Sequence, residues 1–99
     1  AKAALAAYVR SLGRELAGDD VVVSGILPGA FYAPGNSWER LEARDPEVVK
    51  HFIETRLPRN KIAQADEIMP IIALLAGGGA TMMAGTCVAI DAGEGVAYV

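Results

Sequence analysis

The sequence has a single cysteine, Cys87, which stands in the apolar run TCVAI. One thiol excludes a disulfide framework, and we predict that Cys87 is a reduced residue of the core, as fits a reducing, cytoplasmic setting. Basic residues are few as well: nine lysines and arginines are scattered without forming a patch, and the net charge is −3. This charge pattern argues against nucleic acid as a partner.

Charge is absent from residues 68–90, a stretch long enough to be considered as a membrane-spanning helix. The glycines at 77–79 interrupt this stretch, and Pro70 weakens it further. A buried helix, a glycine turn and a buried strand are the better interpretation. We therefore expect no membrane partner.

The first expected helix, over residues 1–18, lacks a capping residue at its start. Its C-terminal end has the residues typical of a helix end, with Arg14 in the last turns and Gly18 at the position of a left-handed cap. No Ser, Thr, Asp or Asn precedes Lys2, so no side chain caps the first backbone N–H groups. We therefore expect the helix to start upstream of this chain, which would make the chain the end of a larger protein. Its apolar stripe is formed by Leu5, Tyr8, Val9, Leu12 and Leu16.

A strand, an irregular excursion over residues 30–60, a helix and a final strand are expected to follow. The run 21–27 is apolar apart from Ser24, which is typical of a strand buried on both faces of a parallel sheet. The last strand is expected over residues 85–91. A strand, a helical crossover and another strand form a right-handed parallel unit. Two parallel strands cannot bury both faces and both edges, so we expect further strands from a missing N-terminal part or from another chain.

Local capping signals place the remaining helices. Asn36 and Glu39 resemble a capping box for the first helix of the excursion. Asp45 and Pro46 mark the start of the second, as an N-cap followed by proline at the first helical position. In the helix after the excursion, Pro70 predicts a missing backbone hydrogen bond or a late start. The apolar stripe of that helix is formed by Ile68, Ile71, Ile72 and Leu75.

The most specific signal is the order of six short motifs along the chain. They are KAAL at residues 2–5, LGREL at 12–16, LPG at 27–29, ADEI at 65–68, LLA at 74–76 and the closing MAGTCVAIDAG. In this order and spacing they resemble the C-terminal portion of a short-chain dehydrogenase/reductase. The resemblance covers essentially all 99 residues. It implies an α/β fold, the C-terminal part of a doubly wound Rossmann-like parallel sheet, with residues 1–99 in a single domain and a substrate lid at about 30–60.

The resemblance also implies a catalytic and cofactor-binding role for Lys2. The catalytic pair of the family is Tyr-x-x-x-Lys, so if Lys2 is that lysine, the tyrosine lies upstream of this chain. The catalytic serine and the Gly-rich phosphate loop would lie further upstream. In such enzymes the lysine ammonium holds the ribose hydroxyls of the nicotinamide nucleotide and lowers the pKa of the tyrosine. Taken without the resemblance, Lys2 is an exposed lysine at a helix end.

Further cofactor contacts are implied at the end of the first strand, at Pro28, Gly29, Phe31 and Ala33. Ligands of open α/β sheets bind beyond the carboxyl ends of the strands, and Gly29 would let a flat ring approach closely. By resemblance, the backbone near Phe31 would meet the nicotinamide carboxamide. The family often has Thr at the position of Ala33 and Asn at that of Ser24, and Ala33 cannot make the hydroxyl contact. Taken alone, Pro28 and Gly29 form an ordinary turn.

Three aromatic residues at the start of the excursion, Phe31, Tyr32 and Trp38, are the candidate substrate residues. They would line a pocket beneath a mobile lid, or equally they pin the excursion to the sheet. We interpret His51 as solvated or structural and Lys61 as structural, and we expect no metal site.

The resemblance therefore implies part of an NAD(P)-dependent oxidoreductase, which transfers hydride between nicotinamide and a carbonyl or secondary alcohol carbon. The cofactor of the complete protein would be NAD or NADP, and its substrate a small carbonyl or alcohol compound. A homo-oligomer (dimer or tetramer), or the missing N-terminal half, is the expected protein partner, and these 99 residues alone are predicted to be inactive. Two alternatives stay open: a non-catalytic fragment that supplies oligomerisation and lid surfaces, and a small binding domain completed by self-association.

Overall fold

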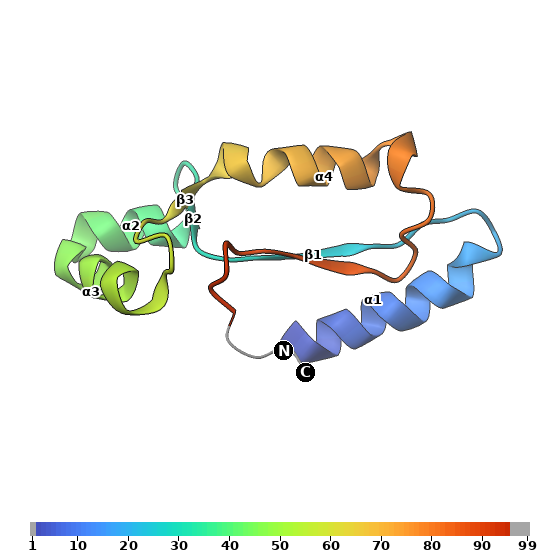
Figure 1. The fold of residues 1–99 in the computed structure, drawn as a ribbon, viewed down its shortest axis with the longest axis horizontal. Helices are drawn as coiled ribbons and strands as arrows, with labels where there is room; N and C mark the ends of the chain where they lie inside the picture. The colour runs from blue at the N-terminus through green and yellow to red at the C-terminus, as the bar shows by residue number, and fades with distance from the viewer. Residues whose placement is uncertain (1, 96–99) are drawn as a thin grey trace. The chain divides into compact units, whose positions relative to one another are not determined.

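The structure, a computed structural model, describes residues 2–95, apart from the side chain of Lys2. The chain divides into two compact units. Of the described residues, the strand unit combines 2–27 with 69–90, and the excursion unit combines 28–68 with 91–95. Figure 1 follows the chain through the helices and strands of both units.

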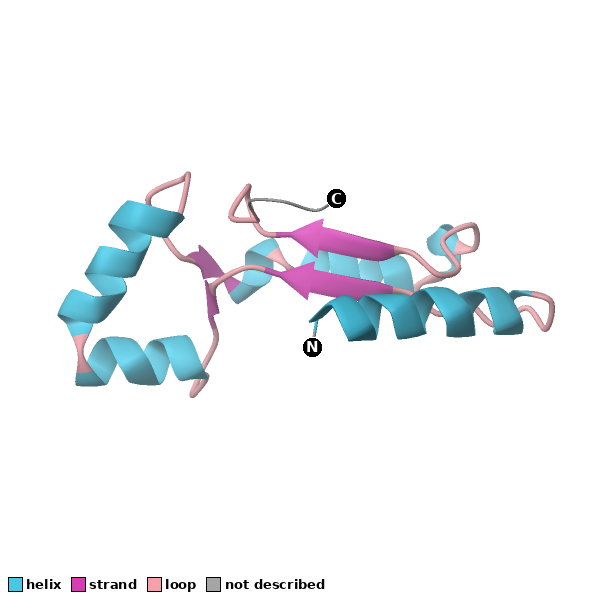
Figure 2. Ribbon diagram, turned by 90° about the horizontal axis from the view of Figure 1, so that it is seen from below, coloured by secondary structure: helices cyan, strands magenta, loops and turns pink. Residues whose placement is uncertain are grey.

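In the strand unit, two parallel strands lie between two helices. β1 (Gly25–Pro28) is the neighbour of β4 (Cys87–Ile90), and Figure 2 shows both strands running in the same direction. α1 (Lys2–Ala17) and α4 (Met69–Ala76) lie on opposite faces of this pair (Figures 1 and 2). The expected layering of helices on both sides of parallel strands is therefore confirmed.

The strands are shorter and more exposed than the sequence predicts. The strand expected over residues 21–27 begins at Gly25, and the last strand begins at Cys87. Val21 and Val22 are 44% and 39% exposed, and every residue of β1 is half-buried. The prediction of a strand buried on both faces is therefore wrong for the described residues. The reason is that β1 has one described neighbour, and a two-stranded sheet cannot cover both of its faces and edges.

α1 buries only part of its expected apolar stripe. Val9 is 8% exposed, and Leu12 and Leu16 are half-buried. Leu5 and Tyr8, however, are 57% and 62% exposed. The burial of this stripe therefore begins at Val9, and its residues in the first two turns of the helix stay exposed.

The end of α1 also differs from the prediction. The Leu16 carbonyl accepts hydrogen bonds from the backbone N–H groups of Asp19 (3.0 Å) and Val21 (3.3 Å). The left-handed residue of this turn is Asp20, with φ +60°. The prediction of Gly18 as the left-handed cap is therefore wrong. Asp tolerates the left-handed region better than most residues that carry a Cβ, so the reversal occurs two residues later.

The excursion unit contains two packed helices and a very short parallel ladder. α2 (Ser37–Arg44) contacts α3 (Pro46–Arg56), and a 3-10 helix, η1 (Ala65–Glu67), follows. β2 (Phe31–Tyr32) pairs in parallel with β3 (Ala63–Gln64). The sequence did not reveal this ladder, because two residues are too few for an alternating pattern.

Both expected helix starts in the excursion are confirmed. Asn36 Oδ1 accepts a hydrogen bond from the Glu39 N–H (3.0 Å), and Asp45 Oδ1 accepts one from the Val48 N–H (3.4 Å). The Glu39 carboxylate bonds the Gly35 N–H (3.0 Å) instead of that of Asn36, so the capping box is shifted by one residue. Each cap satisfies an N–H group that the helix cannot satisfy itself.

α4 begins late, as its proline predicts. It starts at Met69, so Pro70 lies in the first turn, where a backbone N–H has no acceptor within the helix. It ends at Ala76, and the glycines at 77–79 follow. Within residues 2–95, no helix is long and apolar enough to cross a membrane.

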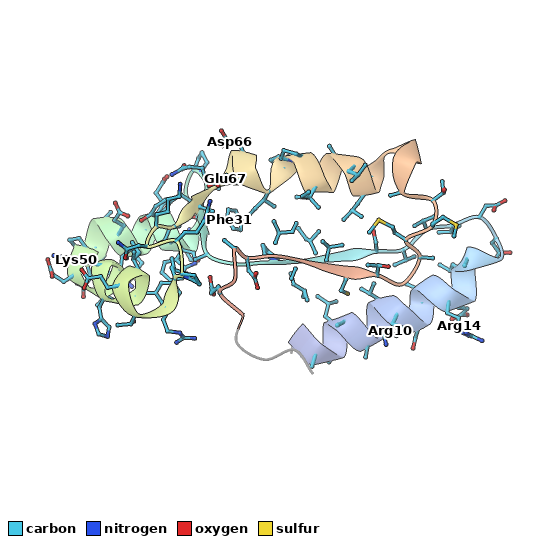
Figure 3. The ribbon with its side chains drawn as sticks, viewed as in Figure 1. Arg10, Arg14, Phe31, Lys50, Asp66 and Glu67 are labelled. Carbon is cyan, nitrogen blue, oxygen red and sulfur yellow. The ribbon has the colours of Figure 1, made fainter. Side chains whose placement is uncertain are left out.

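An ion pair makes the stability of the excursion unit sensitive to acid. Glu67, labelled in Figure 3, accepts a hydrogen bond from Arg59 Nη1 (2.9 Å) and another from the Gln64 N–H (2.9 Å). The bond from Arg59, followed by that from Gln64, lowers the pKa of Glu67 from 4.5 to about 2. Because the folded pKa is the lower one, the contribution of this carboxylate to stability is complete above about pH 4.5 and is lost as the pH falls toward 2.

We expect Glu67→Gln to lower the free energy of unfolding at neutral pH. The difference from the unsubstituted protein should shrink as the pH falls from about 4.5 to about 2. The Glu67 carboxyl of the unsubstituted protein is then protonated and, like the glutamine of the variant, carries no charge. Urea unfolding of both proteins across this range measures the difference. Glu54→Gln, at an exposed position of α3, is the control and should show no such pH dependence. A difference that persists unchanged to the acid end would contradict the role given to this pair.

Candidate functional site

The bend formed by Pro28, the last residue of β1, with Gly29 and Ala30 carries the first residues expected to contact a cofactor. A Cβ built on Gly29 would lie 2.9 Å from Glu94 Oε1 and 3.0 Å from Asp91 Cα. The Ala30 N–H donates a hydrogen bond to the same Glu94 oxygen (3.0 Å). Gly29 therefore packs closely against this part of its own chain, where a larger residue would crowd it, and the sequence did not indicate this contact.

A turn over residues 91–95 forms the other side of this contact. The Asp91 carboxylate accepts hydrogen bonds from the N–H groups of Gly93 (3.1 Å) and Gly95 (3.3 Å). Gly93 has φ +85°, and a Cβ there would lie 3.5 Å from Pro58 Cγ. Glu94 was not among the candidates from sequence. Asp with two nearby glycines indicates a turn, but nothing local reveals its contact with the bend 64 residues away.

Phe31 and Ala33, the next expected cofactor residues, use their carbonyls to hold the start of the excursion. The Phe31 carbonyl accepts a hydrogen bond from Asn36 Nδ2 (2.8 Å), and the Ala33 carbonyl accepts one from the Asn36 N–H (3.0 Å). The Phe31 ring, labelled in Figure 3, is half-buried on β2. A carbonyl has two lone pairs, so the Phe31 oxygen keeps the capacity to accept a second hydrogen bond.

The contacts of Tyr32 and Trp38 lie within the excursion. The Tyr32 hydroxyl donates a hydrogen bond to Glu42 of α2. The Trp38 ring packs on that of Phe52 in α3, with centroids 4.5 Å apart, and the Arg56 guanidinium lies 5.9 Å from the Phe52 centroid. These contacts join α2 to β2 and to α3, so both aromatic residues hold the excursion together.

Lys2 belongs to the strand unit, where it is the first residue of α1, and its side chain lies outside the described residues. The other candidates, which are Pro28, Gly29, Phe31, Tyr32, Ala33 and Trp38, all belong to the excursion unit. His51 and Lys61 are exposed, and Cys87 is a half-buried free thiol. The described part of the chain has no group of three His, Cys, Asp or Glu side chains that could hold a metal ion.

Comparison with known proteins decides the family. A family model described as enoyl-(acyl carrier protein) reductase matches residues 1–94. The chain belongs to the short-chain dehydrogenase/reductase family. The chain shares its fold, parallel strands with helices on both faces, with solved structures.

Two curated relatives of this chain are named as reductases. The 3-oxoacyl-(acyl-carrier-protein) reductase FabG of Pseudomonas aeruginosa is 28% identical over 93 residues, which are 94% of this chain and 35% of the relative. Levodione reductase of Leifsonia aquatica is 32% identical over 79 residues, which are 77% of this chain and 29% of the relative. The chain therefore spans about a third of the length of the curated relatives it matches.

A solved structure adds a bound nucleotide to the comparison. The 3-oxoacyl-(acyl-carrier-protein) reductase of Agrobacterium tumefaciens, solved with NADP bound, superposes with a TM-score of 0.79 at 25% identity. The match covers 93% of this chain and 35% of that structure.

Proposed function

We propose that this chain is the C-terminal part of an NAD(P)-dependent oxidoreductase, which transfers hydride between a nicotinamide ring and a carbonyl or secondary alcohol carbon. The observation that carries the proposal is the family match over residues 1–94, because it includes the bend at the carboxyl end of a parallel strand. The catalytic tyrosine and the nucleotide-binding half would be supplied by the rest of the protein. A cytoplasmic location and a homo-oligomeric state remain predictions.

The bend and the residues that follow it, Phe31 and Ala33, have groups that fit a nicotinamide carboxamide. The Phe31 carbonyl holds one donor, Asn36 Nδ2 at 2.8 Å, and can accept a second hydrogen bond from a carboxamide NH₂. Pro28 and Gly29 would place backbone beside the ring. Ala33 has no hydroxyl, so its contribution would be limited to its backbone and methyl group. The bound nucleotide would supply the hydride, and this chain would hold and orient it.

Lys2 would act on the ribose and on the catalytic proton. Its ammonium would donate hydrogen bonds to the ribose hydroxyls of the nucleotide. Its positive charge would also lower the pKa of a neighbouring tyrosine, so that the phenol could give or take a proton near neutral pH. The lysine would thus couple cofactor binding to proton transfer.

Phe31, Tyr32 and Trp38 would define the substrate side of the site. The Tyr32 and Trp38 contacts with α2 and α3 give the lid a fixed internal structure. Lid and aromatic side chains could then close over a substrate as one body. Acyl thioesters, sugars and steroid-like rings are all compatible with such an aromatic lid.

The proposal is tested on the full-length protein that contains this chain. We expect titration calorimetry to show that it binds NADH or NADPH. We also expect it to oxidise the nucleotide in the presence of an acyl thioester, a sugar or a steroid-like compound that carries a reducible carbonyl group. The isolated 99-residue chain is the control and should bind neither nucleotide measurably. Absence of nucleotide binding by the folded full-length protein would refute the proposal.

A further inference from the structure

We infer that Glu94 is a positioning residue, which holds the bend of Pro28, Gly29 and Ala30 in the conformation needed for the nicotinamide. The structural part of this inference stands on contacts within the excursion unit. The part that concerns the nucleotide rests on the proposed function. Glu94 itself is not proposed to touch the substrate or the reacting atoms.

The bend depends on a partner far away in the sequence. Glu94 Oε1 accepts the hydrogen bond of the Ala30 N–H at 3.0 Å, across a separation of 64 residues. Both Ala30 and Glu94 are half-buried, so water competes less for this bond than at an exposed position. A carboxylate is also a stronger acceptor of a backbone N–H than a neutral group.

The turn over residues 91–95 holds the backbone of Glu94 in place for this contact. The Asp91 carboxylate bonds the N–H groups on both sides of Glu94, those of Gly93 (3.1 Å) and Gly95 (3.3 Å). The Glu94 N–H itself donates to the Asp91 carbonyl (3.0 Å). These three bonds fix the backbone of the turn, so less conformational entropy is lost when the Glu94 side chain meets the bend.

Gly29 makes the bend dependent on this support. A glycine has more backbone freedom than any other residue, so a bend built on one needs outside contacts to keep a single conformation. The Glu94 oxygen lies 2.9 Å from the position that a Cβ of Gly29 would take, so it packs closely against the Gly29 backbone. Loss of the Glu94 side chain would therefore release both the Gly29 backbone and the Ala30 N–H. Phe31 is the next residue after Ala30, so a change in the bend would displace the Phe31 carbonyl, which we propose as a nicotinamide contact.

The test compares three variants of the full-length protein: Glu94→Ala, Glu94→Gln and Glu39→Ala. Glu39 is the matched control, because its carboxylate also accepts a backbone N–H in the excursion, that of Gly35 at 3.0 Å, but away from the bend. For each variant we would measure kcat, the KM for the nucleotide, and hydrogen–deuterium exchange in the peptide covering residues 28–32.

For Glu94→Ala we expect a KM for the nucleotide about tenfold higher, a smaller change in kcat, and exchange about tenfold faster at the bend. Glu94→Gln keeps an acceptor oxygen, so its nucleotide KM and its exchange rate at the bend should both lie within about threefold of those of the unsubstituted protein. Glu39→Ala should change neither, even if it lowers the melting temperature.

Unchanged exchange at the bend in Glu94→Ala would overturn the inference. So would faster exchange with an unchanged KM, or a Glu94→Gln variant as impaired as Glu94→Ala. If the unsubstituted protein binds no nicotinamide nucleotide, the proposed function fails together with the nucleotide part of this inference. The exchange experiment alone then decides whether Glu94 holds the bend.

Discussion

Replacement of Gly13 by alanine is expected to lower the free energy of unfolding by about 3 kcal/mol, because the strand unit has no room for the added methyl group. A Cβ on Gly13 of α1 would lie 2.4 Å from the backbone nitrogen of Gly85 and 2.5 Å from its Cα. The Gly85 N–H donates a 2.7 Å hydrogen bond to the Val23 carbonyl, beside β1. Gly85 therefore cannot move away without breaking the pairing that precedes β4.

The control for this prediction is Gly18→Ala. Gly18 follows the same helix, has nothing within 4 Å of the added Cβ, and does not have a positive φ. Alanine there should be neutral or should stabilise the protein by up to about 1 kcal/mol, because it restricts the unfolded chain. Thermal and urea unfolding of the two variants in the full-length protein measure the contrast. Equal stability of the two would show that α1 does not approach Gly85 as closely as the structure indicates.

Replacement of Lys2 by alanine is expected to reduce kcat by about 10²–10⁴-fold, with little change in the melting temperature. The physical reason is that both proposed tasks of Lys2, holding the ribose and lowering the pKa of the tyrosine, need a positive charge at one place. Steady-state kinetics of the full-length enzyme with its nucleotide would measure the loss. The pH dependence of kcat should shift to higher pH in the variant, because the tyrosine would lose a neighbouring cation.

Lys61→Ala is the matched control for Lys2→Ala. Lys61 is an exposed lysine of the excursion unit, to which we assign no part in binding or catalysis. Its removal should leave kcat and the nucleotide KM unchanged. Full activity of Lys2→Ala would refute the assignment of this lysine, and the catalytic cation would then have to be sought elsewhere in the protein.

The helix starts were predictable because their causes are local. Asn36 and Asp45 cap N–H groups three residues ahead of them, so the cap and its partner lie in the same short stretch of sequence. Pro70 likewise predicted the late start of α4 through its own missing N–H. The order of elements and the parallel strands were predictable from the apolar runs and from the family resemblance together.

The candidate site was predictable only in part. The turn signal of Pro28 and Gly29 predicted the end of a strand there, and β1 does end at Pro28. The resemblance added the expected roles of Lys2, Phe31 and the aromatic residues. The roles of these residues remain predictions. The contacts of Tyr32 with Glu42 and of Trp38 with Phe52 were not predictable, because no pattern in the chain pairs these side chains.

By itself, the sequence determined the family, the order of α1 to α4 with the strands β1 and β4, and the caps that start α2 and α3. These features depend on hydrophobic spacing and on side chains that bond their near neighbours. Only the tertiary structure decided that Gly13 meets Gly85, that β2 pairs with β3, and that Glu94 supports the bend after β1. Such contacts join segments far apart in the chain, and they arise from the packing of complete elements, which no local pattern encodes.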